Sequence, residues 1–193
     1  MSPRIGMDLN IIVKAAIELA DREGMSEVTL ATLAKSLHVR PPSLYNHVKG
    51  GLPALKIELA KRGYSQLNRR LTDASVGRSM DAAVLAFGMA YVQFVRDHPG
   101  LYEAMLMVAV GADEELQDIQ DQSIRIITQV MEGYGLGEHG TLHAVRGLRS
   151  ILHGFASLEQ HGEFGLPLEK DESLTKSINA FLAGIHWFKD SNE

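Results

Sequence analysis

A short segment near the N-terminus gathers side chains whose chemistry suits a nucleic acid. An arginine can pair with a guanine or a phosphate, whereas tyrosine and histidine suit phosphate oxygens better than base edges. Serine and asparagine can bond either partner, so the side chains that read bases stay undecided at this point. The cluster consists of Arg40, Ser43, Tyr45, Asn46, His47 and Lys49.

Two short helices joined by a tight turn are predicted to position this cluster. Thr29 is a good N-cap for the first helix, since its hydroxyl can accept from an otherwise unpaired amide. Pro41 and Pro42 suit the start of the second helix, where backbone amides have no partner. Leu44 and Val48, one turn apart, can dock the second helix on the first. The pattern predicts a helix-turn-helix with a polar outer face suited to a major groove. The apolar face of the first helix comprises Leu30, Leu33, Ala34 and Leu37.

Several motifs in this segment follow the pattern of a known family. They are Val28-Thr29-Leu30, Leu33-Ala34, Leu37-His38-Val39 and Pro42-Ser43-Leu44-Tyr45-Asn46-His47-Val48-Lys49. These motifs resemble the TetR-type transcriptional repressors, over roughly residues 8 to 65. The resemblance implies an all-α homodimer with an N-terminal DNA-binding domain and a C-terminal ligand-binding and dimerisation domain. It also implies that two recognition helices, about Pro42–Val48, enter the major grooves of a palindromic double-stranded DNA operator.

The resemblance also implies roles for single residues. Pro41 offers no side-chain donor where relatives often place a base-reading residue, so readout is expected to depend on Arg40, Ser43 and Asn46. Gly51 stands where many relatives carry a lysine that grips a phosphate. Lys49, Lys56 or the free helix N-terminus must then substitute. By this resemblance Arg40, Ser43, Tyr45 and His47 reach the duplex, and Thr29, Thr32 and Lys49 lie beside its backbone.

Charge is divided unequally along the chain. The formal net charge is −5, but residues 1–70 hold 11 Lys+Arg against 6 Asp+Glu, a balance of +5, and residues 71–193 hold 8 against 18, a balance of −10. A basic front and an acidic rear are expected of an attached nucleic-acid-binding head. A basic excess of this size also occurs on ordinary solvated surfaces, so it supports the prediction only weakly.

Composition and motifs argue against several other classes. The chain has no cysteine, which excludes disulfides and thiolate metal sites and fits a cytoplasmic protein. No apolar run is long enough for a membrane span, and residues 1–6 lack the apolar core of a secretory signal. No phosphate loop, nucleophile elbow or carboxylate pair supports catalysis, so neither enzyme activity nor a cofactor is expected. His139 and His143 lie one turn apart, but spacing fixes no third ligand, and no metal is expected.

Helical periodicity continues through the rest of the chain, and no strand is predicted. An amphipathic helix is expected over Asp8–Glu23, with Asp8 as its N-cap and Gly24 at its end. The expected fold is all-α with about nine helices. A DNA-binding domain at residues 1–51 is followed by a connecting helix at 52–74 and a ligand-binding and dimerisation domain at 75–193. Helices in that last domain are expected over Met80–Asp97, Leu101–Val110, Asp113–Tyr134, Thr141–His161 and Asp171–Lys189.

Small residues form a stripe on each of the last two expected helices, which allows another helix to approach closely. The segment Leu148 to Glu159, with its His153-Gly154 pair, resembles a subtype of the family marked by Trp-His-Gly, and Leu152 stands at the tryptophan position. In the family such a pair meets its symmetry mate as a four-helix interface. Packing of both stripes inside one subunit is the alternative. The stripes are Gly147, Ser150, Gly154 and Ser157 on one helix and Ala180, Ala183 and Gly184 on the other.

The rear half carries aromatic and thioether side chains of the kind that line small-molecule pockets. Such residues at helical spacing are also typical of plain core. Arg149 and His153, one turn apart, could hold an anionic ligand or pair with nearby acids. The expected effector is an unidentified small molecule, apolar or amphipathic. The pocket candidates are Phe87, Tyr91, Phe94, Tyr102, Met105, Arg149, His153 and Phe155.

These observations favour a ligand-responsive, DNA-binding transcriptional repressor. Two alternatives stay open: a helical small-molecule-binding protein and a protein-binding adaptor, in both of which the hairpin is structural. DNA affinity that falls steeply with salt would separate the repressor from the small-molecule-binding protein. A helical rear domain without a cavity would favour the adaptor.

Overall fold

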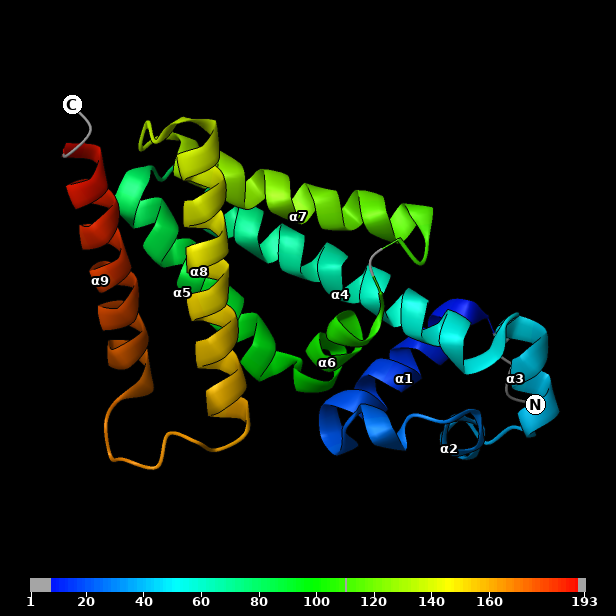
Figure 1. The fold of residues 1–193 in the computed structure, drawn as a ribbon. Helices are drawn as coiled ribbons and strands as arrows, with labels where there is room; N and C mark the ends of the chain where they lie inside the picture. Colours follow the sequence, from blue (N-terminus) through cyan, green and yellow to red (C-terminus); the bar gives the residue numbers. More distant parts are fainter. Residues whose placement is uncertain (1–7, 110, 191–193) are drawn as a thin grey trace. The chain divides into compact units, whose positions relative to one another are not determined.

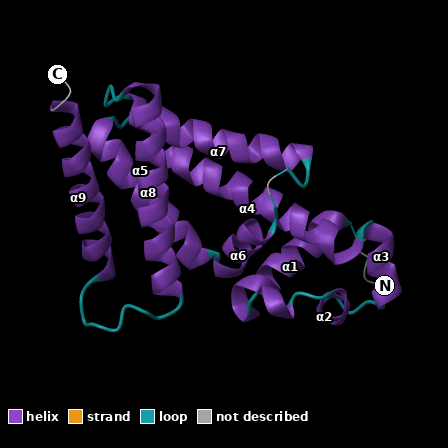
Figure 2. Ribbon diagram, in the orientation of Figure 1, coloured by secondary structure: helices purple, strands orange, loops and turns teal. Residues whose placement is uncertain are grey.

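The computed structural model describes residues 8–109 and 111–190, which form nine α-helices and one short 3-10 helix (Figure 1). These residues contain no strand, which confirms the all-helical fold (Figure 2). None of the helices described is long and apolar enough to cross a lipid bilayer. The helices are α1 (Leu9–Glu23), η1 (the 3-10 helix, Met25–Glu27), α2 (Leu30–Ser36), α3 (Pro41–His47), α4 (Gly51–Ser75), α5 (Met80–Asp97), α6 (Pro99–Met107), α7 (Glu114–Glu132), α8 (Gly137–Gln160) and α9 (Lys170–Asp190).

The described helices fall into two compact units, and both α4 and α7 contribute to each of them. The first unit comprises the chain up to Ser65 together with Asp97–Ile119. The second comprises Gln66–Arg96 together with the chain from Gln120 onward. Helix α6 therefore belongs with α1 to α3, although the chain reaches it only after α5. The sequence pattern predicts a division in chain order, into residues 1–51, 52–74 and 75–193. That assignment of domains stays a prediction.

A side-chain cap or a proline accounts for the start of several helices, and two helices begin earlier than the sequence predicts. Asp8 caps α1 by accepting a hydrogen bond from the amide of Ile11 at 2.9 Å. Helix α6 begins at Pro99, ahead of the expected Leu101, because proline suits a first helical position. Helix α8 begins at Gly137, also earlier than expected, and no side-chain cap accounts for this start.

Helix α6 closes the core of the first unit by packing against α1. A Cβ atom at Gly100 would overlap the backbone carbonyl of Ala20, so only glycine permits this approach. Asp21 of α1 accepts hydrogen bonds from His98 Nδ1 and from the amide of Leu101, both at 2.9 Å. The same carboxylate thereby joins the two helices and satisfies an amide at the start of α6.

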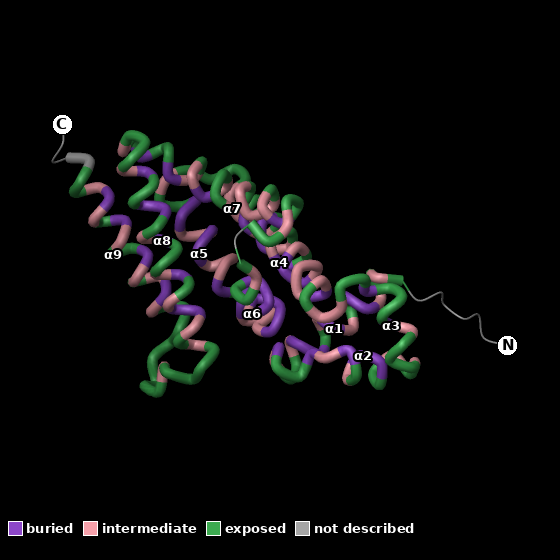
Figure 3. Tube along the Cα trace, turned by 45° about the vertical axis from the view of Figure 1, so that its right-hand side comes forward, coloured by how far each residue is buried: buried purple, intermediate pink, exposed green. Residues whose placement is uncertain are grey.

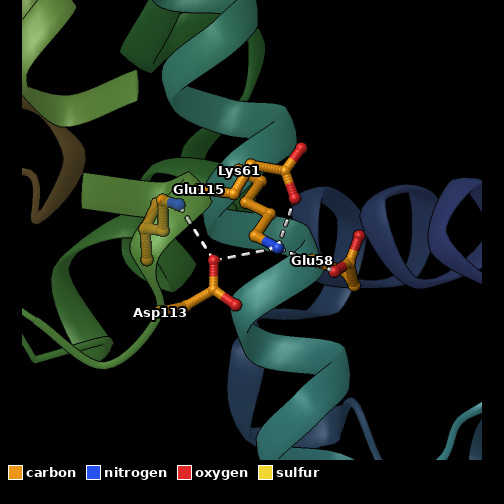
Figure 4. A network of polar contacts seen from close by, with 5 residues as sticks. Glu58, Lys61, Asp113 and Glu115 are labelled. Atoms are coloured by element: carbon orange, nitrogen blue, oxygen red, sulfur yellow. Dashed lines mark hydrogen bonds and ion pairs between the residues drawn. The ribbon is translucent and has the colours of Figure 1, made fainter. Parts of the chain in front are cut away.

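Lys61 ties α4 to the start of α7 within the first unit (Figure 4). Its Nζ atom lies 2.7 Å from Glu115, 2.9 Å from Asp113 and 3.3 Å from Glu58. Asp113 also accepts from the amide of Leu116 at 2.9 Å. Burial alone would lower the pKa of Lys61, but hydrogen bonds to Glu115 and Asp113 and the charge of Glu58 outweigh it, so the pKa is raised. Lys61 therefore stays cationic and holds this contact.

The second unit is closed by contacts of α5 with α8 and α9. A Cβ atom at Gly88 of α5 would lie 2.5 Å from Ile178 of α9, so these helices approach closely. At the C-terminal end of α5, Arg96 Nε lies 2.9 Å from Glu159 of α8 and Arg96 Nη1 lies 2.7 Å from Asp171 of α9. One guanidinium thus joins three helices of the unit.

A second polar contact of this unit involves a fully buried tyrosine. Tyr134 is 0% exposed, and its hydroxyl donates to Asp81 at 2.7 Å. His186 Nε2 lies 3.0 Å from the same carboxylate. Burial opposes the ionised form of Asp81, but the hydrogen bonds from Tyr134 and His186 outweigh it and lower the pKa of Asp81. Burial, reinforced by Asp81, raises the pKa of Tyr134.

Candidate nucleic-acid interface

The first helix of the helix-turn-helix is fixed by two threonines at its start. The Thr29 hydroxyl accepts from the amide of Thr32 at 3.1 Å, and the Thr32 hydroxyl accepts from the amide of Thr29 at 3.0 Å. This reciprocal capping box confirms Thr29 as the N-cap. The Thr32 hydroxyl also donates to the carbonyl of Glu27 at 2.7 Å. Both threonines are half-buried and serve the scaffold, and their contact with a DNA backbone stays a prediction.

The turn between α2 and α3 depends on a non-glycine residue in the left-handed region. His38 has φ +55°, and its amide donates to the carbonyl of Lys35 at 3.2 Å. The amide of Val39 donates to the carbonyl of Ala34 at 2.9 Å. Together these bonds form the Schellman motif that commonly ends a helix, usually with glycine at the left-handed position. The turn therefore directs the chain into α3 at the expense of some backbone strain.

Helix α3 has one buried and one exposed face (Figure 3). Leu44 is 0% exposed and Val48 only 3%, as expected of side chains that dock α3, whereas Tyr45 is 58% exposed. Pro41 and Pro42 occupy the first helical turn, which confirms the predicted start. The polar candidates are therefore presented by a helix whose opposite face is already packed. Arg40, Pro42, Asn46 and His47 are exposed, and Ser43 is half-buried.

Two cations flank α3. Arg40 precedes its first turn and Lys49 follows its last residue, and both are exposed. Within the described ranges of the chain neither residue forms an ion pair. Their charges are therefore not neutralised locally, which is the condition a phosphate contact requires.

The connection from α3 to α4 explains why glycine stands at residue 51. Gly50 has φ +95° and Gly51 has φ +66°, both in the region that side chains other than glycine adopt only with strain. The amide of Gly51 donates to the carbonyl of Val48 at 3.0 Å and so fixes the turn. A lysine at residue 51, as many relatives of the resembled family carry, would be strained in this backbone. Glycine stands at residues 50 and 51 because both positions have a positive φ.

The predicted pocket residues lie in both units. Phe87, Phe94 and Phe155 are buried in the second unit, and Tyr91 is half-buried there. Arg149 and His153 are exposed on α8. Tyr102 and Met105 are buried in the first unit, beside α1 and α4. A ligand pocket built from these residues stays a prediction.

A groove of about 540 Å³ lies between the second half of α8, the following loop and the first half of α9. Phe155 and Phe164 contact each other in it with ring centroids 4.8 Å apart and ring planes tilted by 53°. The groove is lined by one predicted pocket residue, Phe155, and by two predicted interface residues, Ser150 and Gly154. The sequence pattern did not predict that the loop residues Phe164, Leu166 and Leu168 line a groove. Their position beside Gly165 and Pro167 was a signal of apolar side chains in a loop. The other lining residues are Ile151, Leu158, Glu163, Gly165, Leu166, Leu168, Lys170, Ser173 and Ser177.

The small residues of α8 and α9 do not all face the same surroundings. A Cβ atom at Gly154 or at Gly184 would meet nothing within 4 Å, whereas one at Gly147 would lie 3.1 Å from Phe181 of α9. Gly147 therefore serves the packing of α8 on α9 inside the subunit. Ser150, Ala180 and Ala183 are exposed, and Ser157 is half-buried. Their part in an interface stays a prediction.

The histidines considered as metal ligands are exposed. His139 and His143 both lie on the surface of α8. In the part of the chain that the structure describes, no three His, Cys, Asp or Glu side chains are placed to share a metal ion.

Known proteins resemble both halves of the chain. The sequence profile described as "Bacterial regulatory proteins, tetR family" matches residues 12–49, which cover most of α1 and all of α2 and α3. The profile described as "Tetracyclin repressor-like, C-terminal domain" matches residues 84–181. Over 187 residues the chain is 43% identical to the HTH-type transcriptional regulator YobS of Bacillus subtilis, and the match covers 96% of each chain. An HTH-type transcriptional regulator of Mycobacterium tuberculosis is 31% identical over 175 residues, covering 90% of this chain and 79% of that one.

Solved structures share the fold at lower identity. A Rhodococcus sp. RHA1 protein of unknown function superposes with a TM-score of 0.80 and 21% identity, covering 94% of this chain and 97% of that one. TetR from Acinetobacter baumannii AYE, solved as a variant in complex with minocycline, superposes with a TM-score of 0.66 and 18% identity, covering 95% and 98%.

Proposed function

This chain belongs to the TetR family of HTH-type transcriptional regulators, a non-enzymatic family. Within that family, we propose that it is a ligand-responsive repressor that binds a palindromic operator as a homodimer. One observation carries the proposal. Helix α3 is docked by the fully buried Leu44, while Tyr45 on its other face is 58% exposed. A helix held in this way can enter a major groove without rearranging its own core.

The chemistry of the exposed face divides the DNA contacts into two groups. Arg40 can pair with guanine or with a phosphate, and Asn46 and Ser43 can bond base edges. Tyr45 and His47 suit phosphate oxygens, which fix the register of the helix on the duplex. Lys49 adds a further phosphate contact. Thr29 and Thr32 lie beside the DNA backbone in this proposal and keep their capping role.

Dimerisation places two such helices on one operator. The exposed surface of α8 and α9, with open space at Gly154 and Gly184, supports an interface between two copies. Twofold symmetry of the protein then requires an inverted repeat, with half-sites about one DNA turn, roughly 34–36 Å, or a little more apart. Within the family, the His153-Gly154 pair supports placing the chain near the Trp-His-Gly subtype.

A small apolar or amphipathic effector would regulate this binding. The side chains proposed to contact it all belong to the second unit and are Phe87, Tyr91, Phe94, Arg149, His153 and Phe155. The minocycline complex of the Acinetobacter baumannii TetR shows that this fold can hold a drug-sized molecule. An effector changes DNA affinity only through its different affinity for the two dimer states, and such coupling is commonly about 1–3 kcal/mol.

Selection of the purified full chain against a random duplex pool tests the proposal. We expect enrichment of an inverted repeat. The logarithm of its binding constant should fall linearly with the logarithm of the salt concentration. The double variant Arg40→Ala with Tyr45→Ala should lose this binding and keep its dimer mass in light scattering. Arg125→Ala, which removes an exposed cation from α7, is the control and should bind as the parent does.

Other outcomes favour the alternatives. Weak binding without sequence enrichment, and unchanged by the double variant, would refute the recognition role of α3. The chain would then be a small-molecule-binding protein or a protein-binding adaptor with a structural hairpin. Enrichment that survives the double variant would refute only the residue assignment.

A further inference from the structure

The outer face of α8 and α9 carries a hollow at one end and two large aromatic side chains at the other. These helices run side by side in opposite directions (Figure 1). The hollow is the groove beside Gly154, Ser173 and Ser177. At the opposite end of α9, Trp187 is 64% exposed and Phe188 is 56% exposed. Their ring centroids are 5.1 Å apart, so the two side chains form contiguous exposed apolar surface, which commonly marks an interaction site.

Helical periodicity places both features on the same side of α9. Ser173, Ser177, Gly184 and Phe188 are separated by nearly whole turns at 3.6 residues per turn, so they form one line along the helix. Trp187 lies beside that line. The groove and the aromatic pair therefore face in the same direction, at opposite ends of one surface within the second unit.

We propose that a second copy of this chain docks on this surface so that its Trp187 and Phe188 fill the groove, and that the first copy's aromatics fill the groove of the second. This inference rests on the proposed homodimer and specifies its geometry. A twofold axis that crosses both helices near the contact of Gly147 with Phe181 brings each aromatic end onto the partner's groove. That contact lies close to the middle of α8 and of α9, so this axis also gives the greatest overlap of the helices.

A twofold axis parallel to the two helices would give a less densely packed interface. It would set groove against groove and aromatic pair against aromatic pair. Two facing hollows of about 540 Å³ each would remain unfilled, whereas the cores of stable interfaces are packed as densely as protein interiors. With the axis that crosses both helices, the aromatic side chains of each copy fill the groove of the other, so neither groove is left empty.

The area available is consistent with a stable dimer. A buried aromatic side chain covers about 150–250 Å², and somewhat more than half of each remains exposed in the single subunit. Exposed portions of about 90–150 Å² on each of four aromatics, together with an equal area of groove surface, would bury about 700–1,200 Å². The helix surface between the two ends adds to this, which reaches the lower bound of about 1,200 Å² for specific interfaces.

Engineered disulfides give a direct test, because the chain contains no cysteine. In the proposed geometry Ser177 of one copy faces Gly184 of the other. The double variant Ser177→Cys with Gly184→Cys retains both aromatics and should form a covalent dimer on oxidation. The two positions are roughly 10 Å apart along the same helix, too far for a bridge within one chain. The pair Ser150→Cys with Ser177→Cys, both at the groove, should give no covalent dimer.

Tryptophan emission gives an independent test in the unmodified protein, because Trp187 is the single tryptophan. Its emission should shift to shorter wavelength as concentration rises and the side chain enters the groove. Replacing Trp187 and Phe188 by serine should weaken dimerisation by about 30-fold or more, as loss of interface anchors does. Leu142→Ser removes a leucine that is 43% exposed on α8 and lies roughly 80–120° around that helix from the groove residues Ser150 and Gly154, so it should leave dimerisation unchanged.

The outcomes separate this inference from the proposed function. A covalent dimer from the groove pair, or a dimer by light scattering that neither pair cross-links, would overturn the docking geometry and leave the homodimer standing. A full-length chain that stays monomeric at every concentration, with or without operator DNA, would instead overturn the proposed homodimer.

Discussion

Replacing Gly100 by alanine tests how firmly α6 is held to α1. The added methyl group would overlap the carbonyl of Ala20, and side-chain rotation cannot relieve a clash with backbone. Helix α6 would have to move away and weaken the 2.9 Å hydrogen bond from the Leu101 amide to Asp21. Overpacking costs about 1–3 kcal/mol and a weakened hydrogen bond about 0.5–1.5 kcal/mol, while helix propensity returns up to about 1 kcal/mol. The free energy of unfolding should therefore fall by about 2–3 kcal/mol.

Gly63→Ala is the matched control, because this glycine also faces α6 within the first unit. Its Cβ atom would lie 2.6 Å from Cγ and Sδ of Met105, which are atoms of a flexible side chain. Repacking of Met105 and the gain in helix propensity nearly offset each other, so this variant should stay within about 1 kcal/mol of the parent.

Urea unfolding followed by circular dichroism, at one protein concentration for all variants, measures both changes. Hydrogen exchange of the α6 amides would show whether the loss is local to that helix. Should Gly100→Ala prove no more destabilising than Gly63→Ala, the close approach of α6 to α1 would not be a constraint on stability.

Three other changes probe local features. His38→Gly should raise the free energy of unfolding by about 1 kcal/mol, because glycine adopts the left-handed turn at φ +55° without strain; a thermal melt that does not shift upward would refute this. Thr29→Ala should lower it by about 1 kcal/mol through loss of the α2 cap, measured in the same melts. The lowered pKa of Asp81 means that its contribution to stability is complete above the unfolded-state pKa of about 3.9 and is lost as pH falls through the lower folded value. Asp81→Asn should therefore flatten the acid side of the stability–pH curve, and an unchanged slope would show that this carboxylate is not engaged.

Local signals were sufficient to predict the DNA-binding segment. The side chains of Asp8 and Thr29 cap α1 and α2, and Pro41 with Pro42 begins α3, as the sequence indicates. Each of these signals acts within a few residues of the helix end that it determines. The buried face of α3 follows from the single-turn spacing of Leu44 and Val48.

Contacts between distant residues could not be predicted in the same way. Asp21 and His98 are separated by 77 positions, and nothing in the periodicity of either helix indicates that they meet. The assignment of α6 to the first unit depends on that contact and on Gly100, so Tyr102 and Met105 were expected beside residues of the other unit. The groove was also missed, because Phe164, Leu166 and Leu168 lie in a loop without a repeating pattern.

The place of α6 has a consequence for synthesis of the protein. Helices α1 to α3 leave the ribosome early, but the hydrogen bond from Leu101 to Asp21 spans 80 positions and cannot form until α6 has emerged. The first unit, which contains the helix-turn-helix, is therefore discontinuous along the chain, and its non-local closure comes after α5 has been made. A nascent chain cut off before residue 99 would carry the whole of α3 and would lack α6, the helix that closes the core of the first unit.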